Sequence, residues 1–441
     1  MTSPRLRAAA ATACIAASLA LPAGPALAQS ASENALARRL DQLAAELADV
    51  KAELARLQRE RAAPPPAAAT QAAAPAASAA VVASAPQGPG LSLEPSTVLT
   101  SYGEINYNRP TRDSKNTVAD VRRFVLGYQH RFDDKTKVVT ELEVEHAVSS
   151  ASDRGEVEVE QAYIERQLAR QWAVRAGLFL IPAGLLNENH EPTAFYGVER
   201  NFVETAIIPS TWREGGIQVV GAFDNGLTTQ LGVSTGFDLA KWDATSSEGA
   251  ESPLGAIHQE LSLAKARDLS VFGAVNWRGV PGLLLGGSIF TGGASQGQAP
   301  DRARVTLWDL HARYTPGRWD LAALYSRGTI SNTAAFNAPL VGSTTPIPKS
   351  FDGWYAQAAY KVWSNADYSL SPFVRWEEFN TARSFAPLGA GLSPASGRTE
   401  RVATVGANFY VGGGIVLKAD YQRFRENRDA DRFDLGVGWS F

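Results

Sequence analysis

Charged residues recur at every second position in several segments of the chain, and the positions between them are apolar. In the segment 415–424, Lys418 and Asp420 alternate with Leu417 and Tyr421. An extended strand with this pattern sends its charged groups to one face and its apolar groups to the other. A charge at the midplane of a bilayer costs about 2–4 kcal/mol, so a charged face within a membrane must be wet. These residues therefore offer contact with water, ions and polar solutes.

Six basic residues fall on the wet face by this alternation, and we take them as candidates for lining an aqueous passage. Each of them could instead pair with a carboxylate on the same wall, for example Arg375 with Glu377 or Lys418 with Asp420. The six candidates are Arg123, Arg131, Arg175, Arg313, Arg375 and Lys418.

A second concentration of charge lies in the long connection 181–215. Rings of mixed charge filter solutes by size and by field, so this connection is a candidate constriction. The alternative is a solvated surface loop, but the apolar run 206–209 favours packing inward. The candidate residues of this loop are Glu188, His190, Glu191, Glu199, Arg200, Glu204, Arg213 and Glu214.

Catalytic chemistry finds little support. The five histidines are dispersed, and neither G-x-S-x-G nor H-E-x-x-H occurs. The single cysteine, Cys14, allows no intrachain disulfide. The net charge of −3 shows no excess of basic residues of the kind that binds nucleic acid. We therefore expect no enzyme, no cofactor, no metal site and no nucleic-acid partner.

The elements that carry these residues are short alternating segments separated by turn clusters. Sixteen are predicted, at 97–107, 119–132, 136–146, 156–168, 172–180, 216–223, 227–237, 268–278, 283–291, 302–315, 319–328, 352–363, 368–379, 398–411, 415–424 and 432–441. Connections after every second segment are short, whereas most of the others are long. Transmembrane barrels alternate in this way, with tight periplasmic turns and long external loops. The sequence thus predicts an all-β fold, a 16-stranded antiparallel transmembrane β-barrel, wide enough for a channel rather than a packed interior.

The N-terminal part of the chain, residues 1–94, differs from the rest in composition and residue pattern. Residues 1–28 combine two arginines, an apolar run and an A-x-A site, which predicts a secretory signal peptide. Residues 29–61 carry leucine and valine at alternating spacings of four and three, which favours an oligomerising coiled coil over a solvated helix. Residues 62–94 are mostly Ala, Pro, Ser and Gln and are typical of a linker. The barrel is assigned to 95–441.

The sequence resembles the phosphate-selective porins O and P and their wider outer-membrane relatives. The resemblance is carried by RRFVLG (122–127), ELE (141–143), LFLIPAG (178–184), NHE (189–191), ERN (199–201), ETAIIP (204–209), WREGG (212–216), PFVR (372–375) and LKADY (417–421). It implies a trimeric 16-stranded porin, whose best-known relatives line an anion pathway with arginines. Residues 95–441 hold 34 of the 42 Lys and Arg against 38 of the 45 Asp and Glu, so both an anion pathway and a general porin remain open.

These observations predict an outer-membrane porin of a Gram-negative bacterium that lets small hydrophilic solutes or ions diffuse passively, with anions such as phosphate among them. The alternative is an envelope tether, in which the barrel is an anchor and the coiled coil contacts the cell wall. We expect the N-terminal segment in the periplasm, a homotrimer, and contact with outer-membrane lipid and lipopolysaccharide. The amphipathic last strand, which ends in Phe441, is the signal that the barrel-assembly machinery recognises.

Overall fold

The structure is a computed structural model of the 441-residue chain, and it describes residues 91–94, 96–147, 155–300, 302–340, 342–392 and 397–441. The chain divides into two compact units, 1–77 and 78–441, and all described residues belong to the second. The predicted signal peptide, the coiled coil and nearly all of the linker lie outside the described residues. The last four residues of the predicted linker, Leu91–Glu94, form the short strand β1.

All sixteen predicted segments are β-strands. Their bounds are β2 Thr97–Pro110, β3 Val118–Arg131, β4 Thr136–Val144, β5 Val157–Ala169, β6 Trp172–Leu180, β7 Arg213–Ala222, β8 Leu227–Ser234, β9 Ser270–Trp277, β10 Leu283–Gly293, β11 Arg304–Tyr314, β12 Trp319–Ile330, β13 Ser350–Tyr360, β15 Tyr368–Ser384, β16 Glu400–Val411, β17 Ile415–Phe424 and β18 Arg432–Ser440. A two-residue strand, β14 (Trp363–Ser364), extends the edge beside β15.

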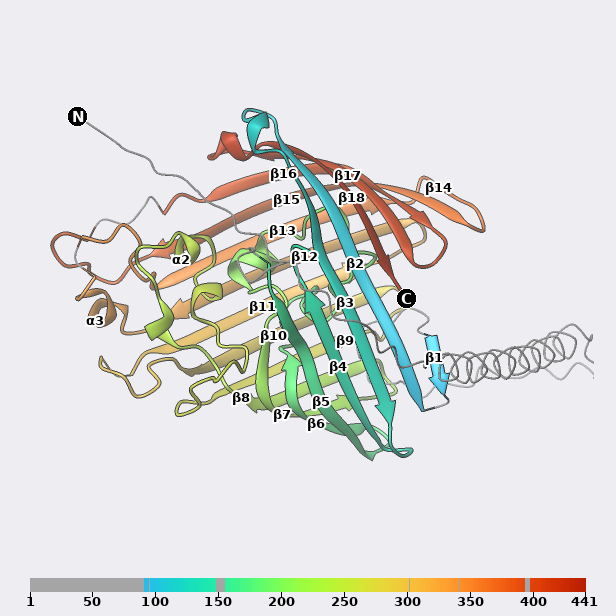
Figure 1. Ribbon diagram of the computed structural model, residues 1–441, viewed down its shortest axis with the longest axis horizontal. Coiled ribbons are helices and arrows are strands. Elements are labelled where there is room, and N and C mark those ends of the chain that lie inside the picture. Colours follow the sequence, from blue (N-terminus) through green and yellow to red (C-terminus); the bar gives the residue numbers. More distant parts are fainter. Residues whose placement is uncertain (1–90, 95, 148–154, 301, 341, 393–396) are drawn as a thin grey trace, which may run out of the picture. The chain divides into compact units, whose positions relative to one another are not determined.

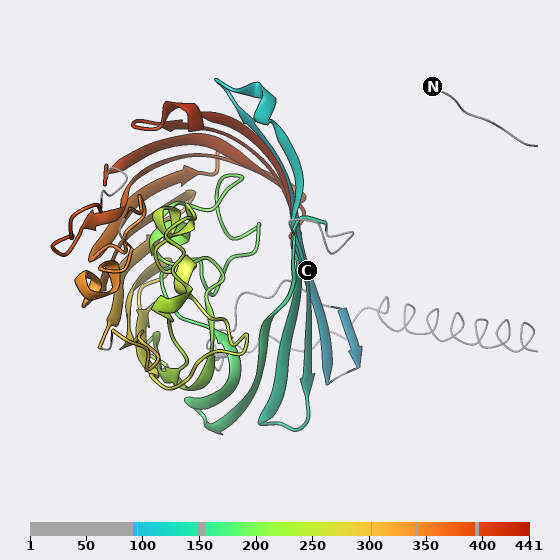
Figure 2. The ribbon, with the colours of Figure 1, turned by 60° about the vertical axis from the view of Figure 1, so that its left-hand side comes forward.

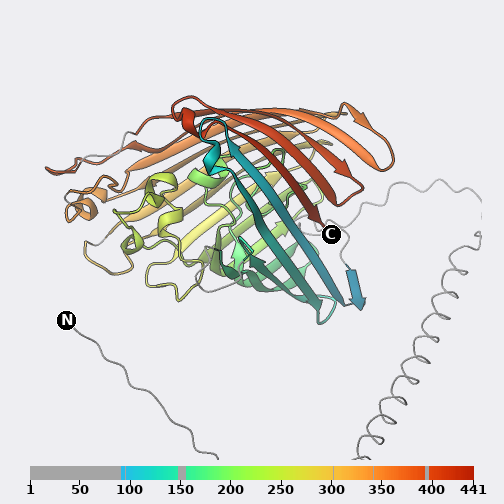
Figure 3. The same cartoon turned by 45° about the horizontal axis from the view of Figure 1, so that its top comes forward.

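Each long strand pairs antiparallel with the next one in the chain, and β18 pairs with β2, which closes the ring (Figures 1 and 3). Of the 18 strands in the described residues, β1 and β14 are appendages and the other 16 form the barrel wall. The predicted strand number and the closed antiparallel topology are therefore confirmed.

The predicted strand ends are less accurate on the side of the long connections. The strand β8 stops at Ser234 rather than at residue 237, because Phe237 turns into the interior and is 1% exposed. The strand β7 begins at Arg213, since Arg213 and Glu214 pair with Leu180 and Phe179 of β6. The prediction that placed these two charged residues in the loop was wrong.

The two faces of the wall differ as the alternation predicts. Leu417 and Leu435 are 45% and 43% exposed on the outside, whereas Lys418 and Asp434 are buried on the inside. Aromatic side chains gather near the short connections, where Trp172 contacts Phe223 and Trp319 contacts Tyr360. An apolar outer face with an aromatic girdle is what a barrel in a membrane requires.

The interior is partly packed, contrary to the expectation of an open lumen. The connections 181–212 and 235–269 fold back among the strands (Figure 2). Their apolar side chains join those of the wall in one cluster that includes Ile207, Trp212, Phe237, Leu254 and Phe290. A 16-stranded wall is too wide for its own side chains to fill, so only inserted loops can bury apolar surface there.

The helices of the described residues are short and lie in connections. They are η1 Ser114–Asn116, η2 Val203–Ile207, η3 Leu239–Lys241, α2 Glu248–Glu251, η4 Gly255–Ile257, α3 Thr333–Asn337 and η5 Arg428–Ala430. Among the described segments, no helix has the length and apolarity needed to span a membrane.

Candidate functional site

The connection 181–212 crosses the barrel interior and is bound to the opposite wall. Its backbone N–H groups donate to inward side chains of three strands: Gly197 to Asn408 of β16 (3.2 Å), Val198 to Asp420 of β17 (2.6 Å) and Phe202 to Glu377 of β15 (2.6 Å). Since the same connection leaves β6 and returns to β7, these bonds hold it across the interior. We call this segment the inner loop.

A buried carboxylate sets the turn at the start of the inner loop. Glu204 accepts hydrogen bonds from the backbone N–H groups of Leu185 (2.5 Å) and Leu186 (2.7 Å) and from the hydroxyl of Tyr355 on β13 (2.9 Å). Burial raises the pKa of this carboxyl, and the hydrogen bonds oppose the shift. Gly184 adopts a φ of +70°, and a Cβ there would clash with Glu204. Glu204, a candidate constriction residue, therefore shapes the loop.

The apolar run of the inner loop packs against the wall and the second inserted connection. Ile207 and Ile208 are no more than 1% exposed, and the Trp212 ring lies 4.5 Å from that of Phe290 and 5.2 Å from that of Phe237, centroid to centroid. The expectation that residues 206–209 pack inward agrees with this geometry. The loop is thus anchored by apolar contacts on one side and by hydrogen bonds on the other.

A cavity of about 600 Å³ remains between the inner loop and the β2–β5 side of the wall. We call it the charged cavity, because most of its lining carries charge. The ionisable side chains around it are Glu104, Arg122, Arg123, Glu145, Glu156, Glu158, Glu199, Arg200, Arg213, Glu248, His258, Glu260 and Arg432. They come from strands, from the inner loop, from the connection after β8 and, for Glu145 and Glu156, from the connection between β4 and β5.

Arg123 and Arg213 of the charged cavity are neutralised by carboxylates, as is Arg432, which lies 3.0 Å from Asp434. Arg123 lies 3.0 Å from Glu104 and 3.3 Å from Glu143, and Arg213 lies 2.5 Å from Glu158 and 3.2 Å from Glu260. Arg123 and Arg213 are nearly buried. Because their charges are compensated at contact distance, they add little positive potential to the cavity.

Three other wall candidates are also paired. Arg175 contacts Glu165 (2.7 Å), and Arg313 contacts Asp320 (2.6 Å). Arg375 contacts Glu377 (2.7 Å), as the alternation suggested, and its guanidinium also donates to the inner-loop carbonyl of Tyr196 (3.0 Å). Their main contacts are therefore with the wall and the loop.

The remaining wall candidates lie elsewhere. Arg131 is exposed at the short-connection rim, as the last residue of β3. Lys418 is buried, and its ammonium lies 3.4 Å from the centroid of the Phe195 ring. The suggested pairing of Lys418 with Asp420 is not formed, because Asp420 instead accepts the Val198 N–H of the inner loop.

Arg200 differs from Arg123, Arg213 and Arg432, each of which lies beside a carboxylate, and among the residues that the structure describes it shares the lack of a close carboxylate with Arg122. Within the described residues, no carboxylate lies within ion-pair distance of its guanidinium, which donates to the Ser210 hydroxyl and to the His190 carbonyl (3.1 Å). Its side chain is 6% exposed and borders the charged cavity. Arg200 is therefore a source of positive potential that no close carboxylate cancels.

His190 and Glu199 of the loop candidate set have partners on the barrel wall. His190 lies 2.8 Å from Glu160 of β5 and 2.6 Å from the Tyr102 hydroxyl of β2, with the half-buried Glu191 next to it in the chain. Glu199 accepts from Asn106 (3.3 Å) and Asn108 (3.1 Å).

Glu188 and Glu214 are likewise held by polar partners. Glu188 accepts from Gln230 at 2.9 Å, and the fully buried Glu214 accepts from Thr235 at 2.5 Å. Of the loop candidates, Glu199, Arg200 and Arg213 line the charged cavity, whereas Glu188, His190, Glu191, Glu204 and Glu214 do not.

Sequence reasoning missed the contribution of the connection after β8. Glu248, His258 and Glu260 line the charged cavity from this segment, and Glu104 lines it from β2. Glu104 follows the strand alternation and could have been identified from it. No local sequence pattern predicts that the connection after β8 runs into the barrel interior. Within the described residues, no cluster of three or more His, Cys, Asp or Glu side chains is arranged to hold a metal ion.

No protein-family model matches the chain. A protein of Aquifex aeolicus (strain VF5), named only as uncharacterized, is 26% identical over 355 residues, which cover 78% of this chain and 79% of its own. The outer membrane channel DcaP of Acinetobacter baumannii and an anion-selective porin from Comamonas acidovorans each give a TM-score of 0.48 at 13% identity, over 80% and 78% of this chain and 99% of their own.

Among solved structures, OmpF of Salmonella typhi, in a complex with daunomycin, matches 78% of this chain and 97% of its own at 12% identity, with a TM-score of 0.54. A likeness at this identity concerns the backbone arrangement. Together with the ring of antiparallel strands, it shows that the chain has the fold of a porin barrel.

Proposed function

We propose that the protein is an outer-membrane channel through which small hydrophilic solutes and ions diffuse passively. The observation that carries the proposal is the charged cavity, a polar space between the inner loop and the wall of a barrel whose outer face is apolar. A water-filled gap lined by charged side chains selects solutes by size and field. In this proposal, Arg200, Arg213 and Glu199 stand at the constriction.

The experiment is conductance of the purified full chain in planar lipid bilayers, where we expect steady ohmic current steps. Thr211→Trp, which places an indole at the lining of the charged cavity, should lower the step size. Ser364→Trp, at the exposed strand β14, is the matched control and should leave it unchanged. Folded protein that gives no current would refute the channel and favour the envelope tether.

We propose further that the permeating solutes include anions such as phosphate, as the resemblance to the phosphate-selective porins implies. The lack of a close carboxylate at Arg200 supports this extension, whereas the pairing of Arg123 and Arg213 limits their contribution. The reversal potential in a salt gradient tests it, since its sign reports whether anions or cations cross more readily. A clear cation preference would refute the extension and leave the channel itself intact.

We also propose a homotrimer in the outer membrane, in contact with lipid and lipopolysaccharide, with the N-terminal segment in the periplasm. Support for assembly by the barrel-assembly machinery comes from β18, whose Phe433 and Leu435 face outward in the strand that leads to Phe441. Chemical cross-linking in outer-membrane fractions tests the oligomer. A band at the monomer mass alone would contradict it.

A further inference from the structure

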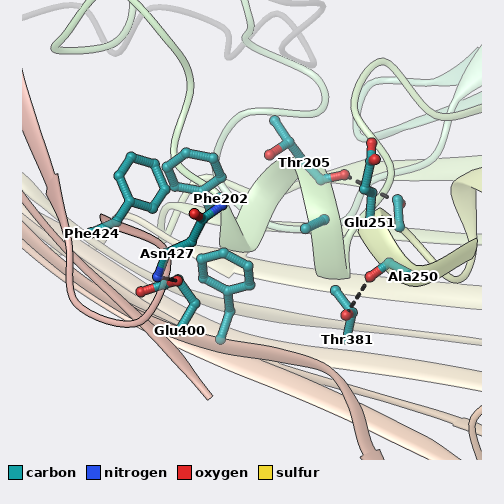
Figure 4. Close-up of a pocket in the computed structure, with 11 residues that line it drawn as sticks. Phe202, Thr205, Ala250, Glu251, Thr381, Glu400, Phe424 and Asn427 are labelled. Atoms are coloured by element: carbon teal, nitrogen blue, oxygen red, sulfur yellow. Dashed lines mark hydrogen bonds between the residues drawn. The ribbon is translucent and has the colours of Figure 1, made fainter. Parts of the chain in front are cut away.

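A second cavity, of about 520 Å³, opens beside the charged cavity, at the end of the barrel that carries the long connections. Its walls come from the inner loop, from the helix α2 and from the ends of β15 and β17 (Figure 4). Its volume is within the range of about 300–1,000 Å³ that small-molecule sites occupy. We call it the aromatic pocket.

One wall of the aromatic pocket consists of three phenylalanine rings. Phe202 of the inner loop stacks on Phe379 of β15, with ring centroids 5.3 Å apart, and meets Phe424 of β17 edge to face at 5.4 Å. Phe202 and Phe379 are half-buried, so each ring keeps exposed surface. A ring-bearing ligand gains apolar burial here and offset or edge-to-face contact as well.

The opposite wall is held in place by hydrogen bonds between the segments. The Thr381 hydroxyl of β15 donates to the Ala250 carbonyl of α2 (2.5 Å), and the Ser252 hydroxyl donates to the Thr205 carbonyl of the inner loop (3.4 Å). These bonds connect the barrel wall, the inner loop and the connection that carries α2. The pocket is therefore formed before any ligand arrives, which lowers the ordering cost of binding.

The charged side chains that line the aromatic pocket are all negative. Two carboxylates, Glu251 and Glu400, line the pocket, and no Lys, Arg or His is among its described lining residues. Glu400 is compensated, because it accepts backbone N–H groups that include those of Arg425 (3.0 Å) and Asn427 (2.9 Å). Glu251 is exposed and accepts a hydrogen bond from the neutral Ser247 hydroxyl (2.7 Å), so no cationic side chain of the described lining neutralises its charge.

We propose that the aromatic pocket binds small organic cations that carry an aromatic ring. The ring lies against Phe202, Phe379 and Phe424, and the cationic group lies toward Glu251. Aromatic faces attract cations as well, so the two features act on the same ligand. Phe202 and Thr205 border both cavities, which places the bound ligand next to the charged cavity.

The test is isothermal titration calorimetry of the full chain in detergent, with phenethylammonium as the probe. This measurement needs no current, so its outcome is independent of whether the protein conducts. We expect binding of phenethylammonium, and much weaker binding of ethylammonium, which lacks the ring, and of 3-phenylpropionate, which reverses the charge. Heats from ethylammonium or from 3-phenylpropionate as large as those from phenethylammonium would overturn the assignment.

Substitutions on α2 locate the site without altering the barrel wall. Ala250→Trp fills the pocket and should abolish binding of phenethylammonium. Glu251→Gln should weaken it about two- to fivefold, as expected for one exposed charge. Glu248→Gln is the matched control, because Glu248 is exposed on the same helix but lines the charged cavity. Unchanged binding in Ala250→Trp, or equal losses in the two glutamate variants, would refute the site.

Discussion

Removal of the Asp420 carboxylate should release the inner loop from the barrel wall. Asp420 lies on β17, is 2% exposed, and accepts the Val198 N–H at 2.6 Å. The substitution Asp420→Ala takes away this acceptor and leaves a buried backbone donor without a partner. Asp420→Asn is the matched control, since the amide oxygen still accepts the same hydrogen bond.

The size of the effect follows from the geometry. A hydrogen bond to a charged group contributes about 1.5–3 kcal/mol, and the second oxygen of Asp420 has no hydrogen-bond partner whose loss would add to it. Each 1.36 kcal/mol changes an equilibrium tenfold, so local opening of the loop should become roughly tenfold to a hundredfold more frequent. The bonds from Gly197 to Asn408 and from Phe202 to Glu377 remain, so the loop opens more often without leaving the interior.

Amide hydrogen exchange of the purified protein measures this opening directly. In Asp420→Ala, the amides of residues 195–202 should exchange faster by that factor, whereas those of the barrel strands keep their rates. In Asp420→Asn, the change should be several times smaller. Exchange of the loop amides in Asp420→Ala at the wild-type rate would refute the claim that this bond holds the loop.

Three further outcomes are expected. Arg200→Ala should lower anion permeability relative to cation permeability, most clearly at about 0.1 M salt or below, where screening is weak; an unchanged reversal potential would remove Arg200 from the constriction. Trp212→Ala should lower the free energy of unfolding by about 3–5 kcal/mol in a denaturant titration, because it removes the buried ring contacts with Phe237 and Phe290 and leaves a cavity. A loss below about 1 kcal/mol would contradict this packing. Deletion of 29–90, which removes the predicted coiled coil, should lower the dissociation temperature of the oligomer on semi-denaturing gels. An unchanged temperature would show that the leucine and valine repeat of residues 29–61 has a role other than oligomerisation.

The sequence by itself determined the strands, their number and the two faces of the wall. Alternation of apolar and charged residues is a local property, because each strand must satisfy lipid on one side and a wet interior on the other. Residues 172–180 and 415–424 coincide with β6 and β17 for this reason. The alternation of short and long connections likewise predicted which strand ends lie together.

The tertiary structure alone decided how the interior is filled and which charges remain unpaired. Arg200 and Arg213 have the same chemistry, but only Arg213 lies beside carboxylates, one from β5 and one from the connection after β8. The aromatic pocket joins Phe202, Phe379 and Phe424 from three distant segments. Such contacts depend on the path of a loop across a space wider than the wall side chains can fill, and no local pattern encodes that path.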